Sequence, residues 1–227
     1  MLNFTVHEIR VLGCLIEKQL ATPDYYPMTE NALVLAANQK TSRDPVMALT
    51  SEEVEEALGA LSRKEFVEQV KVSGSRAFKF RQRLDLRWGI STIDAETQRD
   101  ILAVLAVLAL RGSQTLGQIR QRTERMFHFS DISQLQPIIE ELQQDTEERP
   151  ALIAEDLNAT GRETRYIHLL GDHPSSAGNV VAPMSPTLKM GLEEKIQLLE
   201  ERVAKLEALV GVEQDEALEE TEDSEAE

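Results

Sequence analysis

The sequence has little of what many functional sites are built from. It contains one cysteine in 227 residues, which excludes an intramolecular disulfide and is typical of a reducing compartment. Aromatic residues make up 4%, too few for a base-stacking surface that needs several exposed rings. The longest apolar run, Ile101–Leu110, is about half as long as a bilayer crossing. Since the start shows no secretory leader, we expect a cytoplasmic protein in which this run forms a buried core helix.

Residues with the spacing of a catalytic or metal-binding motif are also missing. The histidines form no H-E-x-x-H pattern, and Cys14 has no C-x-x-C partner. Neither a glycine-rich phosphate loop nor a G-x-S-x-G nucleophile motif occurs. We expect Cys14 to fill the core, and His168, which alternates with Ile167 and Leu169 on a strand, to face solvent. The sequence therefore predicts a protein that is not an enzyme and that binds no metal and no cofactor.

Charge is plentiful, but it is unevenly distributed. The chain carries 24 basic and 40 acidic side chains, a formal net charge of −16. Residues 1–90 hold twelve bases and twelve acids, whereas residues 174–227 hold four bases and fourteen acids and so contribute −10. The stretch 212–227 has no base, and such a block repels itself and stays solvated. We expect it to be a disordered acidic tail, and no membrane partner is indicated.

Local signals in the first part of the chain predict three helices followed by a β-hairpin. Thr5 and Glu8 form a capping box ahead of apolar residues at helical spacing. A second helix starts at Thr29, and a third follows Thr50 with a further capping box. The apolar period then changes to that of strands on both sides of a turn at 73–75.

The same order recurs in the second part. A helix runs through Ile101–Leu110 to Gly112, a short one begins at Thr115, and a third lies between 130 and 144 before a hairpin around 158–161. Pro137 lies inside the third pattern, so that helix either kinks or starts late. The repeated order predicts a mainly α fold with small β-hairpins (α+β): tandem winged-helix domains at 1–90 and 91–171.

Three strings also resemble a known family. They are V-L-G-C-L-I-E-K-Q-L-A-T-P-D-Y-Y-P, N-Q-K-T-S-R-D-P-V-M and, in the second half, L-R-G-S-Q-T-L-G-Q-I-R-Q-R-T-E-R-M-F-H-F-S-D. They are similar to the YceH-like family of bacterial proteins, and the resemblance covers about residues 4–170. It implies a tandem winged-helix fold, gives no established biochemical function and supplies no catalytic residues.

Beyond a flexible linker at 172–187, the segment 188–211 shows a heptad pattern. Apolar residues recur at alternating spacings of four and three: Leu192, Ile196, Leu199, Val203, Leu206 and Val210. Leucine at every d position and Ile or Val at every a position favours a parallel two-stranded coiled coil. We therefore expect a homodimer through this coiled-coil-like helix. A helix that folds back on its own chain would show the same pattern, so that alternative stays open.

The expected winged-helix surfaces carry charges of opposite sign: the third helix is acidic and the hairpin is basic. The third helix of the first domain begins with four glutamates, Glu52, Glu53, Glu55 and Glu56, which would repel phosphates. Its hairpin is basic instead, and the candidate nucleic-acid-binding residues are Lys71, Arg76, Lys79, Arg81 and Arg83. The second domain has another local cluster: Arg111, Arg120, Arg122 and Arg125. A solvated strand face, or pairing of the hairpin cations with the acidic third helix, is the alternative interpretation.

Two functions from different classes follow. The first is a DNA-binding transcriptional regulator, which is favoured because winged helices so often bind DNA. The second is a protein–protein interaction or scaffolding module that uses winged helices as adaptor surfaces, which is favoured by the acidic third helices and the few aromatic residues. The expected partner is therefore DNA or a protein, together with a second copy of the chain.

Overall fold

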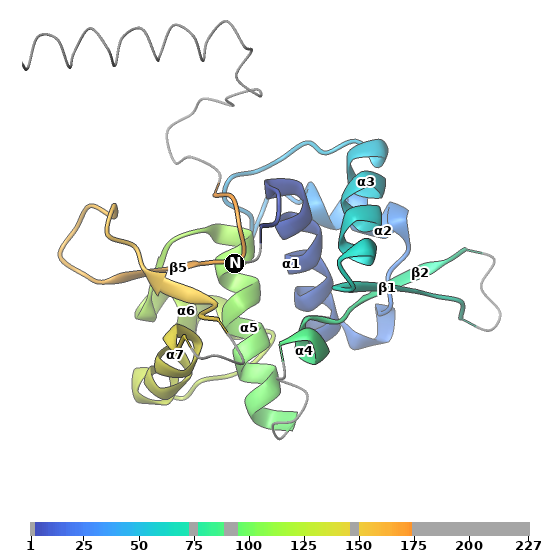
Figure 1. Cartoon of the computed structure of the whole chain (residues 1–227). Helices are drawn as coiled ribbons and strands as arrows, with labels where there is room; N and C mark the ends of the chain where they lie inside the picture. Colours follow the sequence, from blue (N-terminus) through green and yellow to red (C-terminus); the bar gives the residue numbers. More distant parts are fainter. Residues whose placement is uncertain (1–2, 73–76, 89–94, 146–149, 174–227) are drawn as a thin grey trace, which may run out of the picture. The chain divides into compact units, whose positions relative to one another are not determined.

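A computed structural model of the chain describes residues 3–72, 77–88, 95–145 and 150–173. The heptad segment and the acidic tail lie outside the described residues, so both stay predictions. Residues 1–176 form one compact unit. The fold is α+β, as the sequence predicts, with helices and small antiparallel sheets (Figure 1). None of the described helices is both long enough and apolar enough to cross a membrane.

The first half consists of helices followed by an antiparallel hairpin. The elements are α1 (Val6–Ala21), the 3-10 turn η1 (Pro23–Tyr25), α2 (Glu30–Ala37), α3 (Ser51–Arg63), β1 (Val67–Val70) and β2 (Lys79–Gln82). Both predicted capping boxes are confirmed. The backbone N–H of Glu8 donates to Oγ1 of Thr5 at 3.2 Å, and that of Glu53 donates to Oγ1 of Thr50 at 3.2 Å. Each glutamate accepts a hydrogen bond from the backbone N–H of its cap residue in return.

A single residue outside the two strands, Met28, pairs with this hairpin. The N–H of Met28 donates to the carbonyl of Phe80 at 3.1 Å, and the N–H of Phe80 donates back at 2.7 Å. Met28 lies between α1 and α2 in the sequence, so the connection after the first helix pairs with the last strand of the hairpin.

The second half repeats this topology after a short helix, α4 (Leu84–Arg87). Its elements are α5 (Ala95–Arg111), β3 (Gln114–Thr115), α6 (Leu116–Thr123), the 3-10 turn η3 (Ile132–Gln134), α7 (Leu135–Gln143), β4 (Ile153–Glu155) and β5 (Arg165–His168). The strands are ordered β3-β5-β4, so the strand after the first helix again pairs with the last strand. Both halves therefore run helix, pairing segment, helix, helix, hairpin, where the pairing segment is the single bridge of Met28 in the first half and the strand β3 in the second.

Pro137 is accommodated by a late helix start. The turn η3 comes first, and α7 begins only at Leu135. Pro137 therefore lies in the first turn of α7, where a backbone N–H would have no acceptor within the helix. Of the two outcomes predicted for this proline, the late start is the observed one.

The two halves share one hydrophobic core, because α1 packs along α5 (Figure 1). The run Ile101–Leu110 forms the buried part of α5, as predicted, and only Ala109 in it is more than slightly exposed. Gly13 allows the close approach: a Cβ there would lie 3.0 Å from Cδ2 of Leu110. Since this interface joins the two halves within one compact unit, their division into domains at 1–90 and 91–171 stays a prediction.

The two ends of this unit meet. The N–H of Phe4 donates to the carbonyl of Leu170 at 3.1 Å, and the N–H of Asp172 donates to the carbonyl of Phe4 at 3.0 Å. Gly171, between these partners, has φ +152°, and a side chain there would collide with the backbone of Phe4. Only glycine suits this position.

Candidate nucleic-acid interface and basic cleft

The predicted cations of the first hairpin lie in different settings. Lys71 follows β1 and is exposed, Lys79 begins β2, Arg81 lies within β2 and Arg83 follows it. Arg76 lies outside the described residues. Arg81 and Arg83 are two residues apart and so share one face of the strand, as expected from the alternation of side chains.

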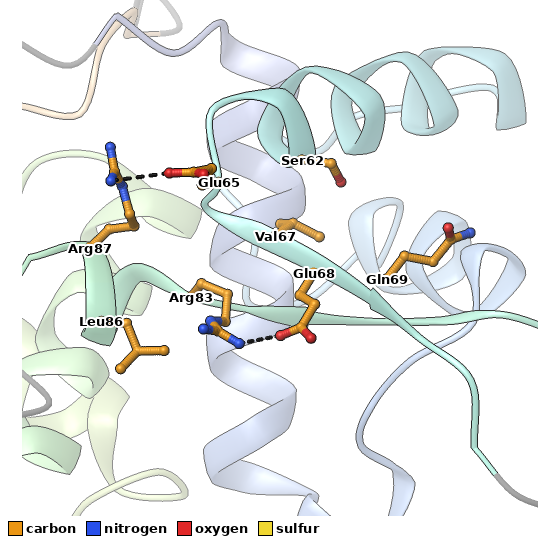
Figure 2. Close-up of a pocket in the computed structure, with 8 residues that line it drawn as sticks. All are labelled: Ser62, Glu65, Val67, Glu68, Gln69, Arg83, Leu86 and Arg87. Carbon is orange, nitrogen blue, oxygen red and sulfur yellow. Dashed lines mark hydrogen bonds and ion pairs between the residues drawn. The ribbon is translucent and has the colours of Figure 1, made fainter.

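These two arginines share one carboxylate within the hairpin. Glu68 of β1 is the direct cross-strand neighbour of Arg81 in the antiparallel register. Nη2 of Arg81 lies 2.8 Å from Oε2 of Glu68. Figure 2 shows the second pairing, in which Nη1 of Arg83 donates to the same oxygen. The hydrogen bond from Arg81, with smaller contributions from Arg83, lowers the pKa of the Glu68 carboxyl. The alternative of internal pairing is therefore correct in kind, but the partner is Glu68 rather than an acid of the third helix.

A shallow cavity of about 500 Å³ lies beside these pairs (Figure 2). Its other ion pair joins Nη1 of Arg87 to Oε2 of Glu65 at 3.2 Å. Because Arg83 and Arg87, the two cations that line the cavity, each face a carboxylate, the cavity has no excess positive charge with which to attract an anion.

Lys71 and Lys79 remain available. In the part of the chain that the structure describes, neither side chain has a hydrogen bond or an ion pair. Lys79 lines a groove of about 340 Å³ together with Lys18, near the end of α1, and Tyr25, which is 79% exposed. Among the described residues of the hairpin, unpaired positive charge therefore lies at Lys79 in this groove and at the exposed Lys71 outside it.

The third helix of the first half presents acids to solvent. Glu52, Glu55 and Glu56 are exposed on α3, and Glu53 caps its first turn. Carboxylates in this position oppose the approach of phosphates. The predicted acidic surface on α3 is therefore confirmed.

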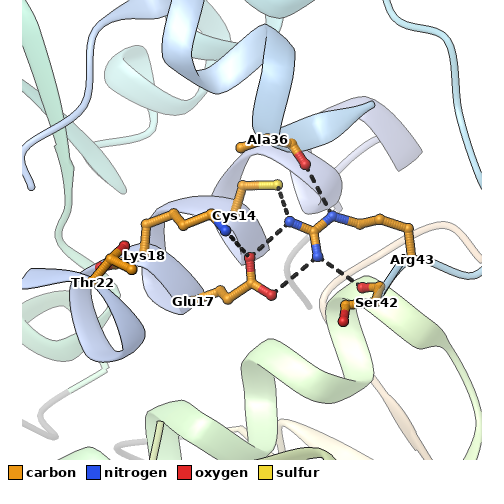
Figure 3. A network of polar contacts seen from close by, with 7 residues as sticks. All are labelled: Cys14, Glu17, Lys18, Thr22, Ala36, Ser42 and Arg43. Carbon is orange, nitrogen blue, oxygen red and sulfur yellow. Dashed lines mark hydrogen bonds and ion pairs between the residues drawn. The ribbon is translucent and has the colours of Figure 1, made fainter. Parts of the chain in front are cut away.

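A buried polar network has Arg43 at its centre (Figure 3). The guanidinium is fully buried and donates to Oε2 of Glu17 at 2.7 Å, to Oε1 of Glu17 at 3.1 Å and to the carbonyls of Ala36 at 3.1 Å and Ser42 at 2.7 Å. The remaining N–H contacts Sγ of Cys14 at 3.5 Å. All the N–H groups of the guanidinium thus have acceptors, and the loop after α2 is fixed against α1.

The pKa values in this network follow from burial and from the arginine. Burial opposes the charge on Glu17, but the hydrogen bonds and the charge of Arg43 outweigh it and lower the pKa of the carboxyl. Burial raises the pKa of the Cys14 thiol, which lies in the core as predicted. A buried thiol with a raised pKa is a poor nucleophile.

The loop fixed by Arg43 forms one wall of a cleft of about 450 Å³, which we call the basic cleft. Its other walls are the end of α1, the end of α5 and the α6 region. Five cations and one carboxylate line it: Lys18, Lys40, Arg111, Arg122, Arg125 and Glu17. The carboxylate is already paired with Arg43 at 2.7 Å and with Lys18 at 3.1 Å.

The cations of the basic cleft repel one another. Burial and then the neighbouring Arg122 lower the pKa of Arg111. Lys40, Arg111, Arg122 and Arg125 have no side-chain hydrogen bond and no ion pair among the described residues. The cleft therefore concentrates positive charge that the described chain does not neutralise.

The structure brings together three of the four arginines of the predicted second-half cluster. Arg120 points elsewhere, because its guanidinium donates to the carbonyl of Phe129 at 3.1 Å and to that of Ser130 at 2.9 Å. Sequence reasoning missed Lys18 and Lys40, which come from the other half and reach the cleft only through the packing of α1 on α5. No local sequence signal marks them.

The prediction that His168 faces solvent is wrong. Its side chain is almost fully buried, as is that of Leu170 two residues further along the chain. The ring lies 4.2 Å from that of His173, and burial lowers the pKa of His168 to about 3. Within the described ranges, these two histidines included, no three His, Cys, Asp or Glu residues are grouped in a way that could hold a metal ion.

This arrangement defines an α+β protein built from two halves of the same topology, with an internally paired hairpin and a basic cleft. Residues 4–162 match the family described as "Protein of unknown function, DUF480", and the chain belongs to that family. The resemblance to YceH-like proteins is thereby confirmed.

Relatives of similar length extend across most of the chain. A UPF0502 protein of Geobacter sulfurreducens is 43% identical over 203 residues, which cover 88% of each chain. A UPF0502 protein of Klebsiella pneumoniae subsp. pneumoniae is 38% identical over 209 residues, 91% of this chain and 94% of the relative. The UPF0502 protein YceH of Salmonella paratyphi A is 38% identical over 206 residues, 90% of this chain and 93% of the relative. None of these names states an activity.

Proposed function

We propose that the chain is a non-enzymatic tandem winged-helix protein that binds DNA as a transcriptional regulator. The observation that supports this most is the duplicated topology. In each half, three helices are followed by a hairpin, and the segment after the first helix pairs with the last strand, through Met28 in the first half and through β3 in the second. Helix-turn-helix folds of this kind contact DNA through a helix and through flanking elements that reach the phosphates.

The contact is made by unpaired cations of the first hairpin. Lys71 and Lys79 are available, whereas Arg81 and Arg83 are held by Glu68. Because α3 exposes carboxylates, the proposed contact is to the phosphate backbone and not a reading of bases by that helix. Such binding depends strongly on salt and only weakly on sequence.

The test is fluorescence anisotropy of a labelled mixed-sequence duplex with the full-length chain at low salt. Replacing both Lys71 and Lys79 by alanine should weaken binding and reduce the slope of log K against log salt by up to about 2, one for each lost phosphate contact. The matched control replaces Arg99 and Arg162, two exposed cations away from the first hairpin, and should keep the wild-type slope. Absence of binding by the wild-type chain at low salt would rule out the regulator.

A second candidate function is a protein-interaction or scaffolding module. The exposed glutamates of α3 and the internal pairing of the hairpin arginines favour it, because both features weaken an attraction to DNA. It becomes the better proposal if the wild-type chain leaves the duplex unbound at low salt.

A homodimer through residues 188–211 belongs to either function, since pairing two copies doubles the contact surface. Sedimentation of the full-length chain should give a dimer, and a chain that ends at Ser176 should give a monomer. This truncation keeps Asp172, whose N–H donates to Phe4. A full-length monomer would show instead that the heptad helix does not associate with a second copy.

A further inference from the structure

The basic cleft is concave and lies where the two halves of the unit meet. Its volume of about 450 Å³ falls in the range of about 300–1,000 Å³ that is usual for small-molecule sites. The cations that line it come from α1, from the loop after α2, from the end of α5 and from the α6 region. Side chains from four segments thus converge on one space.

The charge in this space is positive even after the nearby acids are counted. Glu17 already accepts from Arg43 and Lys18, so it cannot also satisfy the other cations. Asp44 and Glu17 both act on the charge of Arg111, but the opposing effect of Arg122 and Arg43 is larger. A folded chain that holds like charges together gains from a ligand that neutralises them.

The carbonyls at the end of α5 oppose an anion, but two of them are already occupied. The N–H of Asp44 donates to the carbonyl of Leu110 at 2.9 Å, and the N–H of Gly112 donates to that of Leu108 at 2.9 Å. Their residual negative charge is therefore reduced at the position where Arg111 and Arg122 face the cleft.

We propose that the basic cleft binds a small ligand that carries at least two linked phosphate groups. Guanidinium forks match phosphate oxygens in bidentate geometry, and Arg111, Arg122 and Arg125 together offer more donors than one phosphate uses. Lys40 supplies a further point charge from the loop after α2. The apolar part of the lining, from Ala106, Val107, Leu110 and Met126, gives the rest of such a molecule a place to pack. This site goes beyond the proposed DNA contact, which uses the hairpin.

Isothermal titration of the full-length chain with pyrophosphate at low salt tests the proposal. We expect one site per chain, and affinity at least about tenfold higher than for inorganic phosphate, because the second phosphate engages further charge-assisted hydrogen bonds. Arg122→Gln and Arg111→Gln should each weaken pyrophosphate binding by about tenfold or more. The control Arg162→Gln removes one exposed charge outside the cleft and should leave binding unchanged.

Lys40→Gln adds a variant on an exposed loop residue, whose loss should not affect folding, and it should weaken binding as well. Thermal unfolding of every variant confirms that the fold is retained. Absence of saturable pyrophosphate binding, or equal weakening in Arg162→Gln and the cleft variants, would overturn the proposal.

A parallel titration with duplex DNA separates the two possible sources of phosphate. If Arg111→Gln and Arg122→Gln weaken only duplex binding and pyrophosphate does not bind, the cleft contacts nucleic acid and the small-ligand proposal is wrong. If pyrophosphate binds as expected while the duplex does not bind, the cleft proposal holds and the proposed DNA function fails alone.

Discussion

Arg43 and Glu17 form a buried ion pair, with Nη2 of the arginine 2.7 Å from Oε2 of the glutamate. The pair joins the loop after α2 to α1, and that loop also carries Lys40 into the wall of the basic cleft. The geometry of the cleft therefore depends on an interaction that lies beneath it. A change in this pair should alter stability and ligand binding together.

The variant Glu17→Gln should lower the free energy of unfolding by about 3 kcal/mol, because it leaves the buried guanidinium without a counter-charge. Urea unfolding at pH 7 measures the loss. Glu55→Gln, on the exposed face of α3, is the matched control and should stay within about 0.5 kcal/mol of wild type. Equal stability of Glu17→Gln and wild type would show that the pair is not a net source of stability.

The burial of His168 should make stability depend on pH in the acidic range. Its pKa falls from 6.5 to about 3 on folding, so the unfolded chain takes up a proton that the folded chain refuses. Stability is complete above about 6.5 and declines as the pH falls toward 3, by up to about 1.4 kcal/mol per pH unit.

Urea unfolding at pH 7 and at pH 5 tests this dependence. His168→Phe should reduce the difference between the two values, while His128→Gln, at an exposed position, should retain it. A variant His168→Phe with the full wild-type difference would assign the effect to other groups. The protonation of Glu17 is a separate effect: the hydrogen bonds and charge of Arg43 outweigh burial and lower the pKa of this carboxyl, so it takes up a proton only at lower pH than an ordinary glutamate.

The contact between α1 and α5 should be sensitive to size at position 13. Gly13→Val would place side-chain atoms where Leu110 and Ala109 already lie, and we expect a loss of about 2 kcal/mol. Gly59→Ala in α3 is the opposite case: its Cβ would meet only Nη1 of Arg63 at 3.4 Å, so a gain of about 0.5 kcal/mol is expected from helix propensity. Thermal unfolding of both variants checks the pair, and an unaffected Gly13→Val would contradict the tight packing.

Removing the carboxylate that holds the hairpin arginines should strengthen any binding to DNA. Glu68→Gln removes the negative charge that faces Arg81 and Arg83, so both guanidinium groups can turn to phosphates instead. We expect tighter duplex binding and a steeper salt dependence, by up to about 2 in the slope. Anisotropy at several salt concentrations measures both. A weaker affinity of Glu68→Gln would mean that the ion pairs shape the hairpin for binding.

Arg122→Gln should separate binding from stability. It removes a charge that opposes that of Arg111, so the free energy of unfolding should rise by up to about 0.5 kcal/mol while the proposed pyrophosphate affinity falls. Thermal unfolding without ligand measures the first effect. A destabilised Arg122→Gln would indicate that the arginine packs against the fold and does not serve a ligand.

The features that could be predicted from the sequence are those fixed by residues close together in the chain. The capping boxes at Thr5 and Thr50 involve residues three apart, so the sequence shows both partners. The run Ile101–Leu110 has apolar residues at every position, which indicates a helix that is buried all round. To predict the pairing of Glu68 with Arg81, the register of the hairpin must be known. The sequence indicates that register only through the position of the turn between the two strands. For His168, the alternation of side chains along the strand separates two faces, and apolar residues lie on both of them. The pattern therefore does not indicate which of the two faces packs on the core.

The basic cleft could be predicted only in part, for a related reason. Arg111, Arg122 and Arg125 lie close together in the sequence, and their clustering was visible. Lys18 and Lys40 lie far from them along the chain, and only the packing of α1 against α5 makes the five side chains one site.

The contact between Phe4 and Gly171 constrains the order in which the chain can fold during its synthesis. During synthesis the first residues of the unit leave the ribosome long before their strand partner exists. The apolar face that α1 later presents to α5 must therefore wait through the synthesis of most of the unit. Full closure comes only when Gly171 and Asp172 emerge and bond to Phe4. A ribosome stalled before α5 has emerged would thus hold a chain whose first helix still lacks its partner in the second half.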